Sequence, residues 1–321
     1  MNTAKMQFVR RVDASLSAED IPLAGGKAAN LSALSEIGRV PQGFVVLSTA
    51  FRRVVANSGA PSAIATLLVS SAGRATQEAA IARVTDLIER SALPDGLFGE
   101  IEASLDEMSV DRFAVRSSAN VEDTATNSFA GAFRSCLNVP RSEVISSIRQ
   151  CWISLYSRRS LNYAASRAVD LARAELAVIV QAMLSPESAG VCFTADPVAG
   201  TPGIYVVEVV MGLGEGLVSG RVTPHTYWID SATSRIVREH GPEQETLVHN
   251  QPVGGIREVH LKPGGSRAFL REEQVRDLVA VATRIERRFG SPQDIEFAVV
   301  GESIYLLQTR PITNGTLGSP N

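Results

Sequence analysis

Residues 294–311 read DIEFAVVGESIYLLQTRP, and this pattern predicts a β-hairpin. Two runs rich in β-branched and aromatic residues flank a short polar break, GES (301–303). If GES is a three-residue loop, Glu296 faces Gln308, and Arg310 lies on the same side two residues further on. The hairpin then presents a carboxylate, an amide and a guanidinium together at its open end.

The length of the loop decides this arrangement. With three residues in the loop, the rest of the same face is filled by Ala298, Val300, Ile304 and Leu306. A two-residue loop would instead move Gln308 to the opposite face.

A carboxylate beside an amide oxygen is a hard-oxygen site of the kind that Mg²⁺ prefers. Mg²⁺ takes one or two protein oxygens and completes its octahedron with waters and phosphates. The planar guanidinium of Arg310 suits a phosphate, and Asp294 is placed to support the site. An ion pair between Arg310 and Glu296 at a sheet edge explains the same residues equally well.

Three other stretches add anion-binding features. In AGGKAAN (24–30), two glycines precede Lys27 at the predicted start of a helix, although the Walker A pattern is absent. In FAVRSS (113–118), Arg116 leaves a strand beside two serines, and SFAGAF (128–133) is a small-residue loop that could cover phosphates. A glycine turn and an ordinary loop are the alternatives.

The third stretch is VVEVVMGLGEG (206–216), in which Glu208 interrupts an apolar strand. A buried carboxylate is costly without a partner or a metal, and Arg221 is one possible partner.

Composition excludes several classes of protein. The net charge is −3 and aromatic residues make up 6% of the chain, so neither a basic field nor a base-stacking surface points to nucleic acid. No window approaches eighteen consecutive apolar residues, and MNTAKMQFVRRV has no apolar core of signal-peptide length. Three cysteines without CxxC spacing are expected to be small buried side chains, which fits a reducing cytoplasm.

The remaining elements mix helix and strand without regular βαβ alternation, which predicts an α+β fold. We expect helices at 27–37 and 275–290, two around Gly73, and one long helical region at 142–173. Strands are expected at 112–118 and 176–184. We predict an N-terminal lobe over 1–184 with a helical insert near 62–105, a C-terminal lobe over 185–313, and a tail at 314–321.

In combination, these stretches resemble a known family. GGKAANL (25–31), AVRSS (114–118) with SFAGAF (128–133), VIVQAM (178–183), GVCFTADPVAG (190–200), VEVVMGLGEGLVSGRVTP (207–224) and DIEF (294–297) with YLLQTRPIT (305–313) look like the nucleotide-binding domain of phosphoenolpyruvate synthase, pyruvate phosphate dikinase and rifampin phosphotransferase. The resemblance runs from about residue 20 to residue 313. Six motifs in this order are highly specific.

The resemblance implies an ATP-grasp-like fold in which two α+β lobes clamp ATP. Lys27 and Arg116 would hold the phosphates, together with Arg310, and the loop of Gly131, Ala132 and Phe133 would close over them. Gln181 and the backbone of Ala182 and Met183 would meet the adenine. Asp294, Glu296, Gln308 and Arg310 would hold Mg²⁺ and the polyphosphate, with Glu296 and Gln308 on the metal and Glu208 nearby.

The family reaction passes the β,γ part of ATP to a histidine and releases AMP. The family's carrier histidine lies in a glycine-rich Thr-Ser-His context, which this sequence does not contain. We expect His225, His240, His249 and His260 to be surface or hydrogen-bonded residues. Relatives often carry polar residues where this chain has Ala132 and Phe133, and Arg134 adds a charge.

The sequence therefore predicts the ATP-binding part of a cytoplasmic phosphotransferase that acts on a histidine of a partner protein or domain. A stand-alone small-molecule kinase or ATP-grasp-type ligase is the first alternative. A non-catalytic nucleotide-sensing module is the second, although a sensor need not keep a complete phosphate and metal set.

Overall fold

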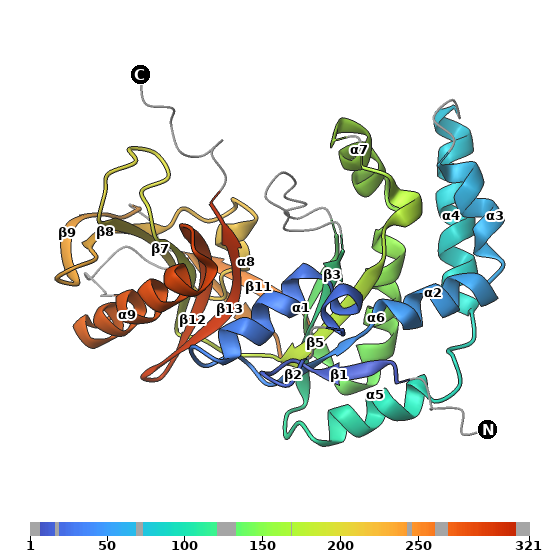
Figure 1. Cartoon of the computed structure of the whole chain (residues 1–321), viewed down its shortest axis with the longest axis horizontal. Coiled ribbons are helices and arrows are strands. Elements are labelled where there is room, and N and C mark those ends of the chain that lie inside the picture. The colour runs from blue at the N-terminus through green and yellow to red at the C-terminus, as the bar shows by residue number, and fades with distance from the viewer. Residues whose placement is uncertain are drawn as a thin grey trace. The chain divides into compact units, whose positions relative to one another are not determined.

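The computed structural model describes residues 7–16, 19–68, 73–120, 133–167, 169–242, 246–260 and 269–312 (Figure 1). The chain divides into two compact units. Unit 1 comprises Met1–Ala29 and Gln42–Met183, and unit 2 comprises Asn30–Pro41 and Leu184–Asn321. The boundary at Ala29 falls inside helix α1 (Ile21–Ser35).

Unit 1 is built on an antiparallel sheet with the strand order β1-β2-β5-β3-β4. Its strands are β1 (Val9–Arg11), β2 (Gly43–Val46), β3 (Arg112–Ala119), β4 (Ser135–Pro140) and β5 (Leu176–Ala182). The apolar run predicted as a buried strand is β5, and six of its seven residues are buried.

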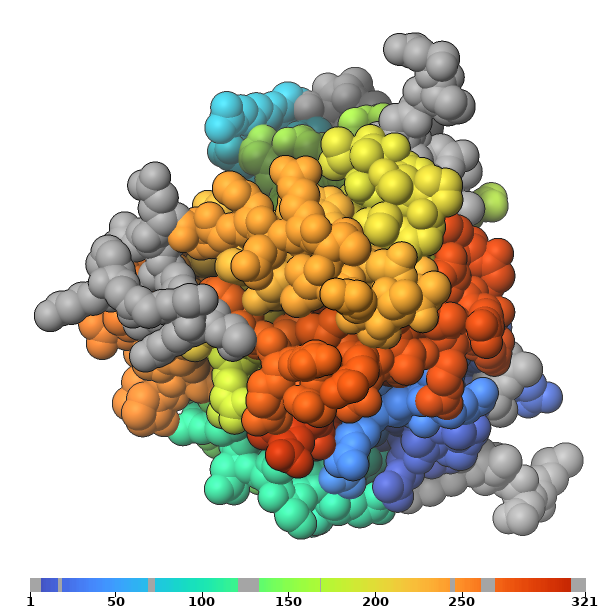
Figure 2. Space-filling model, turned by 90° about the vertical axis from the view of Figure 1, so that its left-hand side faces the viewer, coloured from blue at the N-terminus to red at the C-terminus, as the bar shows by residue number. Residues whose placement is uncertain are grey.

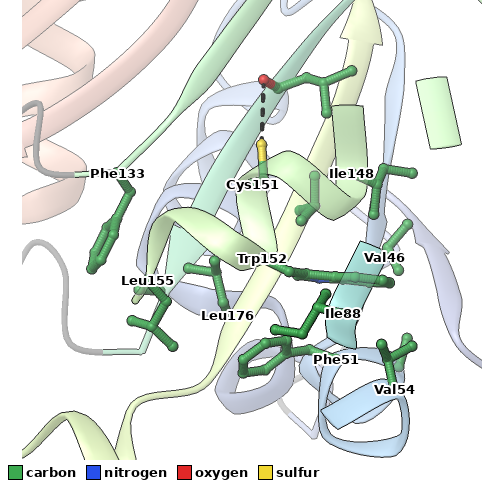
Figure 3. Close-up of a cluster of buried hydrophobic side chains, with 14 of the residues drawn as sticks. Val46, Phe51, Val54, Ile88, Phe133, Ile148, Cys151, Trp152, Leu155 and Leu176 are labelled. Carbon is green, nitrogen blue, oxygen red and sulfur yellow. Dashed lines mark hydrogen bonds between the residues drawn. The ribbon is translucent and has the colours of Figure 1, made fainter. Parts of the chain in front are cut away.

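The helices of unit 1 extend the apolar core of this sheet, some by packing on its strands and others by packing on neighbouring helices. They are α2 (Ser48–Asn57), α3 (Ala60–Leu67), α4 (Arg74–Arg90), α5 (Leu97–Asp106), α6 (Val144–Ser154) and α7 (Arg158–Arg167). Trp152 of α6 is fully buried and meets Phe51 of α2 at a ring-centroid distance of 6.2 Å (Figure 3). Ile88 of α4 joins the same apolar cluster, so the predicted helical insert shares the core of unit 1.

Unit 2 is built on a larger sheet with the order β11-β10-β7-β6-β12-β13, and β8 and β9 continue from β7. Its strands are β6 (Ser188–Phe193), β7 (Ile204–Gly212), β8 (His225–Asp230), β9 (Arg235–His240), β10 (Thr246–Asn250), β11 (Ile256–His260), β12 (Gln293–Val300) and β13 (Ser303–Pro311). Among these described strands, only the β7–β10 pair is parallel. The predicted α+β class is confirmed.

Helix α9 (Glu272–Phe289) covers one face of this sheet, and the short helix α8 (Glu215–Val218) follows β7. Leu278, Ala282 and Ile285 of α9 are fully buried, and Tyr205 of β7 donates a hydrogen bond to Glu286 at 2.8 Å. Strand β9, whose residues are all exposed, lies on the side of unit 2 that Figure 2 shows in yellow to red.

Two predicted helices differ in the structure. Helix α1 begins at Ile21, but Gly25 interrupts it with φ +78°, so its second segment starts near the predicted Lys27. The predicted helical region 142–173 is broken into α6, α7 and a 3₁₀ turn at Leu171–Arg173. Residues 155–157 make turn hydrogen bonds between these helices.

The stretch Asn30–Pro41, predicted to lie in the N-terminal lobe, belongs to unit 2. The carbonyl of Arg39 accepts a 2.7 Å hydrogen bond from Leu306 of β13, and Gly38 packs on the side chain of Leu306. The hydrogen-bonding edge of β13 thus holds a segment that is distant in sequence.

Substitution of Gly25 tests the turn that precedes Lys27. A Cβ at Gly25 would lie 2.4 Å from the carbonyl oxygen of Ser118, in addition to the strain of φ +78°. We expect Gly25→Ala to lower the unfolding free energy by about 3 kcal/mol or more. Urea unfolding measures this change.

Gly59→Ala is the matched control, because Gly59 has φ +73° and no atom of the described residues lies within 4 Å of the place that a Cβ would take. Its expected loss is about 1 kcal/mol, from backbone strain alone. Equal losses in the two variants would show that the contact with Ser118 does not restrict residue 25.

Candidate functional site

Strands β12 and β13 place Glu296 directly opposite Gln308, as predicted. The route to this pairing differs from the prediction, because Val300 pairs with Ser303 and the turn has two residues, Gly301 and Glu302. A β-bulge at Leu307 then shifts the register, since Phe297 pairs with Leu306 while Glu296 pairs with Gln308. The extra residue restores the side-chain alignment that a two-residue turn would lose.

The bulge also changes which apolar residues share a face with Glu296. Between the bulge and the turn, Ala298 pairs with Tyr305 and Val300 pairs with Ser303. The prediction that Ile304 and Leu306 lie on the face of Glu296 is therefore wrong. Leu306 pairs with Phe297, and both are buried on the other side of the hairpin.

The register extends the polar face across the sheet. Val191 of β6 pairs with Glu296 on one side and with Glu208 of β7 on the other. Directly paired residues project to the same face, so Glu208 and Glu296 share it, with backbones about 10 Å apart across two strand spacings. The opposite face, with Ile295, Cys192 and Val207, is fully buried.

Asp294 and Arg310 form an ion pair at the open end of the hairpin. The Nε and Nη2 atoms of Arg310 lie 2.8 and 2.7 Å from Oδ2 of Asp294. The carboxylate is nearly buried, whereas the guanidinium is one-third exposed. Arg221 was considered as an ion-pair partner of Glu208. In the structure it instead forms an ion pair with Glu258 at 2.8 Å.

Glu208 stands in an acidic environment. Burial raises the pKa of its carboxyl group, and the negative charge of Asp294 raises that pKa further. A cation placed on this face would relieve both effects.

Residues to which the sequence analysis gave no role hold the hairpin end in place. Asn30 donates a 2.9 Å hydrogen bond to the carbonyl of Thr309, between Gln308 and Arg310. The Thr309 hydroxyl donates to the side-chain oxygen of Gln293 at 2.9 Å, and the backbone N–H of Gln293 donates to the hydroxyl of Thr194 at 2.9 Å. Asn30 is the last residue of GGKAAN, three residues after Lys27, and its place in that motif is the sequence signal that could have identified it.

In unit 1, Lys27 lies beside the strand that carries Arg116. Its ammonium group donates to the carbonyl of Ser117 at 3.4 Å, and the amide of Ala28 donates to Ser118 at 3.2 Å. Arg116 is half-buried and pairs with Ile179 of β5. The two predicted phosphate-binding residues are therefore anchored around the same segment of β3.

Gln181 lies on the same sheet face as Arg116. It pairs with Ala114, two residues before Arg116, and its side chain is buried. The amides of Ala182 and Met183 donate to the carbonyls of Gln42 and Arg112 at 2.8 and 2.9 Å. Because these amide hydrogens are already hydrogen-bonded, an adenine base at this segment would contact the backbone carbonyls or side chains of the protein.

The predicted phosphate-covering loop is only partly described. Gly131 and Ala132 lie outside the described residues, and Phe133 is buried in the core of unit 1 (Figure 3). Among the histidines, His225 packs on Tyr227 and Phe269 at centroid distances of 4.6 and 5.1 Å, whereas His240 and His260 are exposed.

The oxygen-bearing side chains of unit 2 fit a hard cation that takes its remaining ligands from water or phosphate. Glu296 and Gln308 supply two paired oxygen-bearing side chains, and Mg²⁺ commonly uses so few protein ligands with phosphate. Within the described ranges, no three His, Cys, Asp or Glu side chains gather closely enough to hold a metal by themselves. No helix in those ranges combines the length and apolarity needed to cross a membrane.

Comparison with known proteins now defines the family. Residues 21–319 match the family described as pyruvate phosphate dikinase, AMP/ATP-binding domain, and the chain belongs to it. The chain is 37% identical to a rifampicin phosphotransferase of Streptomyces sviceus, over 98% of this chain and 36% of the relative. It is 33% identical to a probable phosphoenolpyruvate synthase of Methanothermobacter thermautotrophicus, over 94% of this chain and 45% of the relative.

The chain thus spans less than half the length of these relatives. Among solved structures, D-alanine–D-alanine ligase from Helicobacter pylori aligns with 68% of this chain at 11% identity. Its TM-score of 0.28 is too low to bear on the fold.

The raised pKa of Glu208 predicts a pH-dependent effect of Glu208→Gln on stability. The folded protein binds this proton more tightly than the unfolded chain, so Glu208 makes wild type less stable as pH rises through the carboxyl range. We expect Glu208→Gln to gain stability relative to wild type at about pH 7, with the gain shrinking toward about pH 4. Urea unfolding at both pH values measures the difference.

Glu302→Gln, in the exposed turn between β12 and β13, provides the reference for removing a carboxylate from unit 2. A stability gain in Glu208→Gln that grows as the pH falls would contradict the assigned environment.

Proposed function

We propose that this chain is the ATP-binding part of a dikinase-type phosphotransferase with an ATP-grasp-like fold. The observation that supports this most directly is the pairing of Glu296 with Gln308, with Arg310 on the same face. The family match over residues 21–319 supports it independently.

In unit 2, Glu296 and Gln308 would ligate Mg²⁺, and Arg310 would contact the phosphates. The magnesium ion supplies charge neutralisation to the polyphosphate when bound. Asp294 holds the guanidinium of Arg310 through the 2.7 Å ion pair, so that its remaining N–H groups are pre-oriented. Glu208 lies on the same face and would be stabilised in its charged form by a cation.

In unit 1, Lys27 and Arg116 would contribute two further positive charges to the phosphates. Arg116 is part of β3, and Lys27 lies beside that strand. The Lys27 ammonium group donates to the carbonyl of Ser117, and the backbone amide of Ala28 donates to the Ser118 hydroxyl. Gln181 and the carbonyls around Ala182 and Met183 would meet the adenine. Gly131 and Ala132 would close over the phosphates, whereas Phe133, which was predicted to join them, is buried in the core and would anchor the loop there.

The proposed reaction moves the β,γ-pyrophosphoryl group of ATP to a histidine. A P–N bond forms between an imidazole nitrogen and the β-phosphorus, and the bond from that phosphorus to the oxygen it shares with the α-phosphate breaks. AMP leaves with that oxygen, and the imidazole loses its N–H proton. The enzyme's contribution is positioning and charge stabilisation rather than covalent chemistry.

The acceptor histidine would come from a partner protein or domain. His225 packs between aromatic rings, and the sequence contains no glycine-rich Thr-Ser-His segment. A cytoplasmic location is part of the proposal, because three free cysteines fit a reducing compartment.

The nucleotide products test this function. The protein is incubated with Mg-ATP alone, with a histidine-bearing partner domain of the family, and with candidate small metabolites. We expect AMP together with an acid-labile pyrophosphohistidine, and only when the partner is present. Turnover with a metabolite alone, or ATP binding without turnover under all conditions, would overturn the proposed transfer.

Removal of the metal ligand gives a sharper test. Glu296→Ala is expected to lower turnover about 100-fold or more and to weaken the dependence on Mg²⁺, with the fold retained. Glu302→Ala removes an exposed carboxylate from the turn of the same hairpin and serves as the control. Circular dichroism confirms folding, and full activity of Glu296→Ala would eliminate the metal assignment.

A further inference from the structure

Two of the three cysteines of the chain form a pair that the proposed function does not use. Cys136 lies on β4 and is half-buried, whereas Cys151 lies on α6 and is fully buried. Both were predicted from the sequence to be small buried residues, and the structure brings them to the same part of β3.

Val115 of β3 links the two positions. It pairs directly with Cys136 across the β3–β4 ladder, and its carbonyl accepts a 3.8 Å hydrogen bond from the thiol of Cys151 (Figure 3). Cys136 and Cys151 therefore both lie against Val115, the first through strand pairing and the second through its thiol. Two cysteines that lie against the same residue need little movement to reach disulfide geometry.

The surroundings of Cys136 favour its thiolate. The positive charge of Arg134 lies close enough to stabilise the thiolate, while the protonated thiol donates a 3.7 Å hydrogen bond to Oε1 of Gln150. Gln150 and Arg134 also line a cavity of about 640 Å³ in unit 1, so a space for small molecules lies beside two neighbours of Cys136.

The electrostatics agree with this geometry. The hydrogen bond from Cys151 is the main cause that lowers the pKa of Cys136 to about 6, and Arg134 lowers it further. For Cys151, the hydrogen bond to Cys136 and the burial of the side chain both raise the pKa. Cys136 is therefore the nucleophile of the pair and Cys151 the thiol that reacts second.

We propose that Cys136 is a modification site for hydroperoxides, and that Cys151 resolves the oxidised form into an intramolecular disulfide. The Cys136 thiolate attacks a peroxide oxygen and breaks the O–O bond, giving a sulfenic acid and, from hydrogen peroxide, hydroxide that is protonated to water. The Cys151 sulfur then attacks the sulfenic sulfur, the S–S bond forms, and a second water leaves. Two thiols lose two electrons and two protons, and one peroxide is reduced to two waters.

The disulfide would act on the strand that carries Arg116. The sulfurs must approach to about 2 Å, which draws α6 toward β4 at Val115, the residue before Arg116. We expect the oxidised protein to bind ATP more weakly than the reduced protein. This consequence, unlike the disulfide itself, rests on the proposed function.

The disulfide is tested on the whole purified chain with stoichiometric hydrogen peroxide. Intact mass and non-reducing peptide mapping should show the loss of two hydrogens and a peptide that joins Cys136 to Cys151. Cys151→Ser should instead accumulate a dimedone-reactive sulfenic acid at Cys136, and Cys136→Ser should form neither product. Cys192→Ser is the matched control and should react as wild type does, since Cys192 is fully buried and burial raises its pKa.

A measurement on wild type alone keeps the test independent of whether the variants fold. Iodoacetamide at about pH 7 should alkylate Cys136 faster than Cys192 by at least tenfold. Equal rates, or peroxide products that join two chains rather than Cys136 to Cys151, would overturn the proposal.

The effect on ATP is read from the affinities of the reduced and oxidised forms of wild type. Equal affinities would refute the action on the Arg116 strand. A reduced protein that does not bind ATP would refute the proposed function, while the mapped disulfide would still stand.

Discussion

The candidate site of unit 2 depends on the register of β12 between its two neighbours. Ile295 and Phe297 must face α9, because both are fully buried. Their alternation with Asp294 and Glu296 sends both carboxylates to the opposite face. A slip of one residue would bury two charges and expose the core, so hydrophobic burial holds the acidic side chains in position.

The same constraint explains the bulge at Leu307. Leu306 is needed in the core beside Phe297, whereas Gln308 is needed opposite Glu296. A regular ladder from a two-residue turn satisfies only the first of these requirements. One extra residue satisfies both, and the hydrogen bonds from Asn30 and Thr309 then hold the strand beyond the bulge.

Unit 1 positions its basic residues in a different way. Gly25 lets the α1 backbone approach Ser118 so closely that no side chain fits, and this contact anchors the segment that begins with Lys27. Arg116 lies on the outer face of β3, whereas Val115 faces the core, pairs with Cys136 and accepts a hydrogen bond from the Cys151 thiol. Strand β3 thus separates the proposed phosphate contacts from the proposed oxidation site.

Local patterns in the sequence were enough to predict the alternation of β12, the paired runs of the hairpin, the buried strand β5 and the amphipathic helix α9, because each depends on residues that are close in the chain. Local spacing was also enough to select Lys27, Arg116, Glu296 and Gln308 as candidate site residues. The three-dimensional fold was needed for the bulge at Leu307, the membership of Asn30–Pro41 in unit 2, the shared face of Glu208 and Glu296, and the meeting of Cys136 with Cys151. These features arise from contacts between residues distant in sequence, and the free energy of packing and hydrogen bonding there outweighs any local preference.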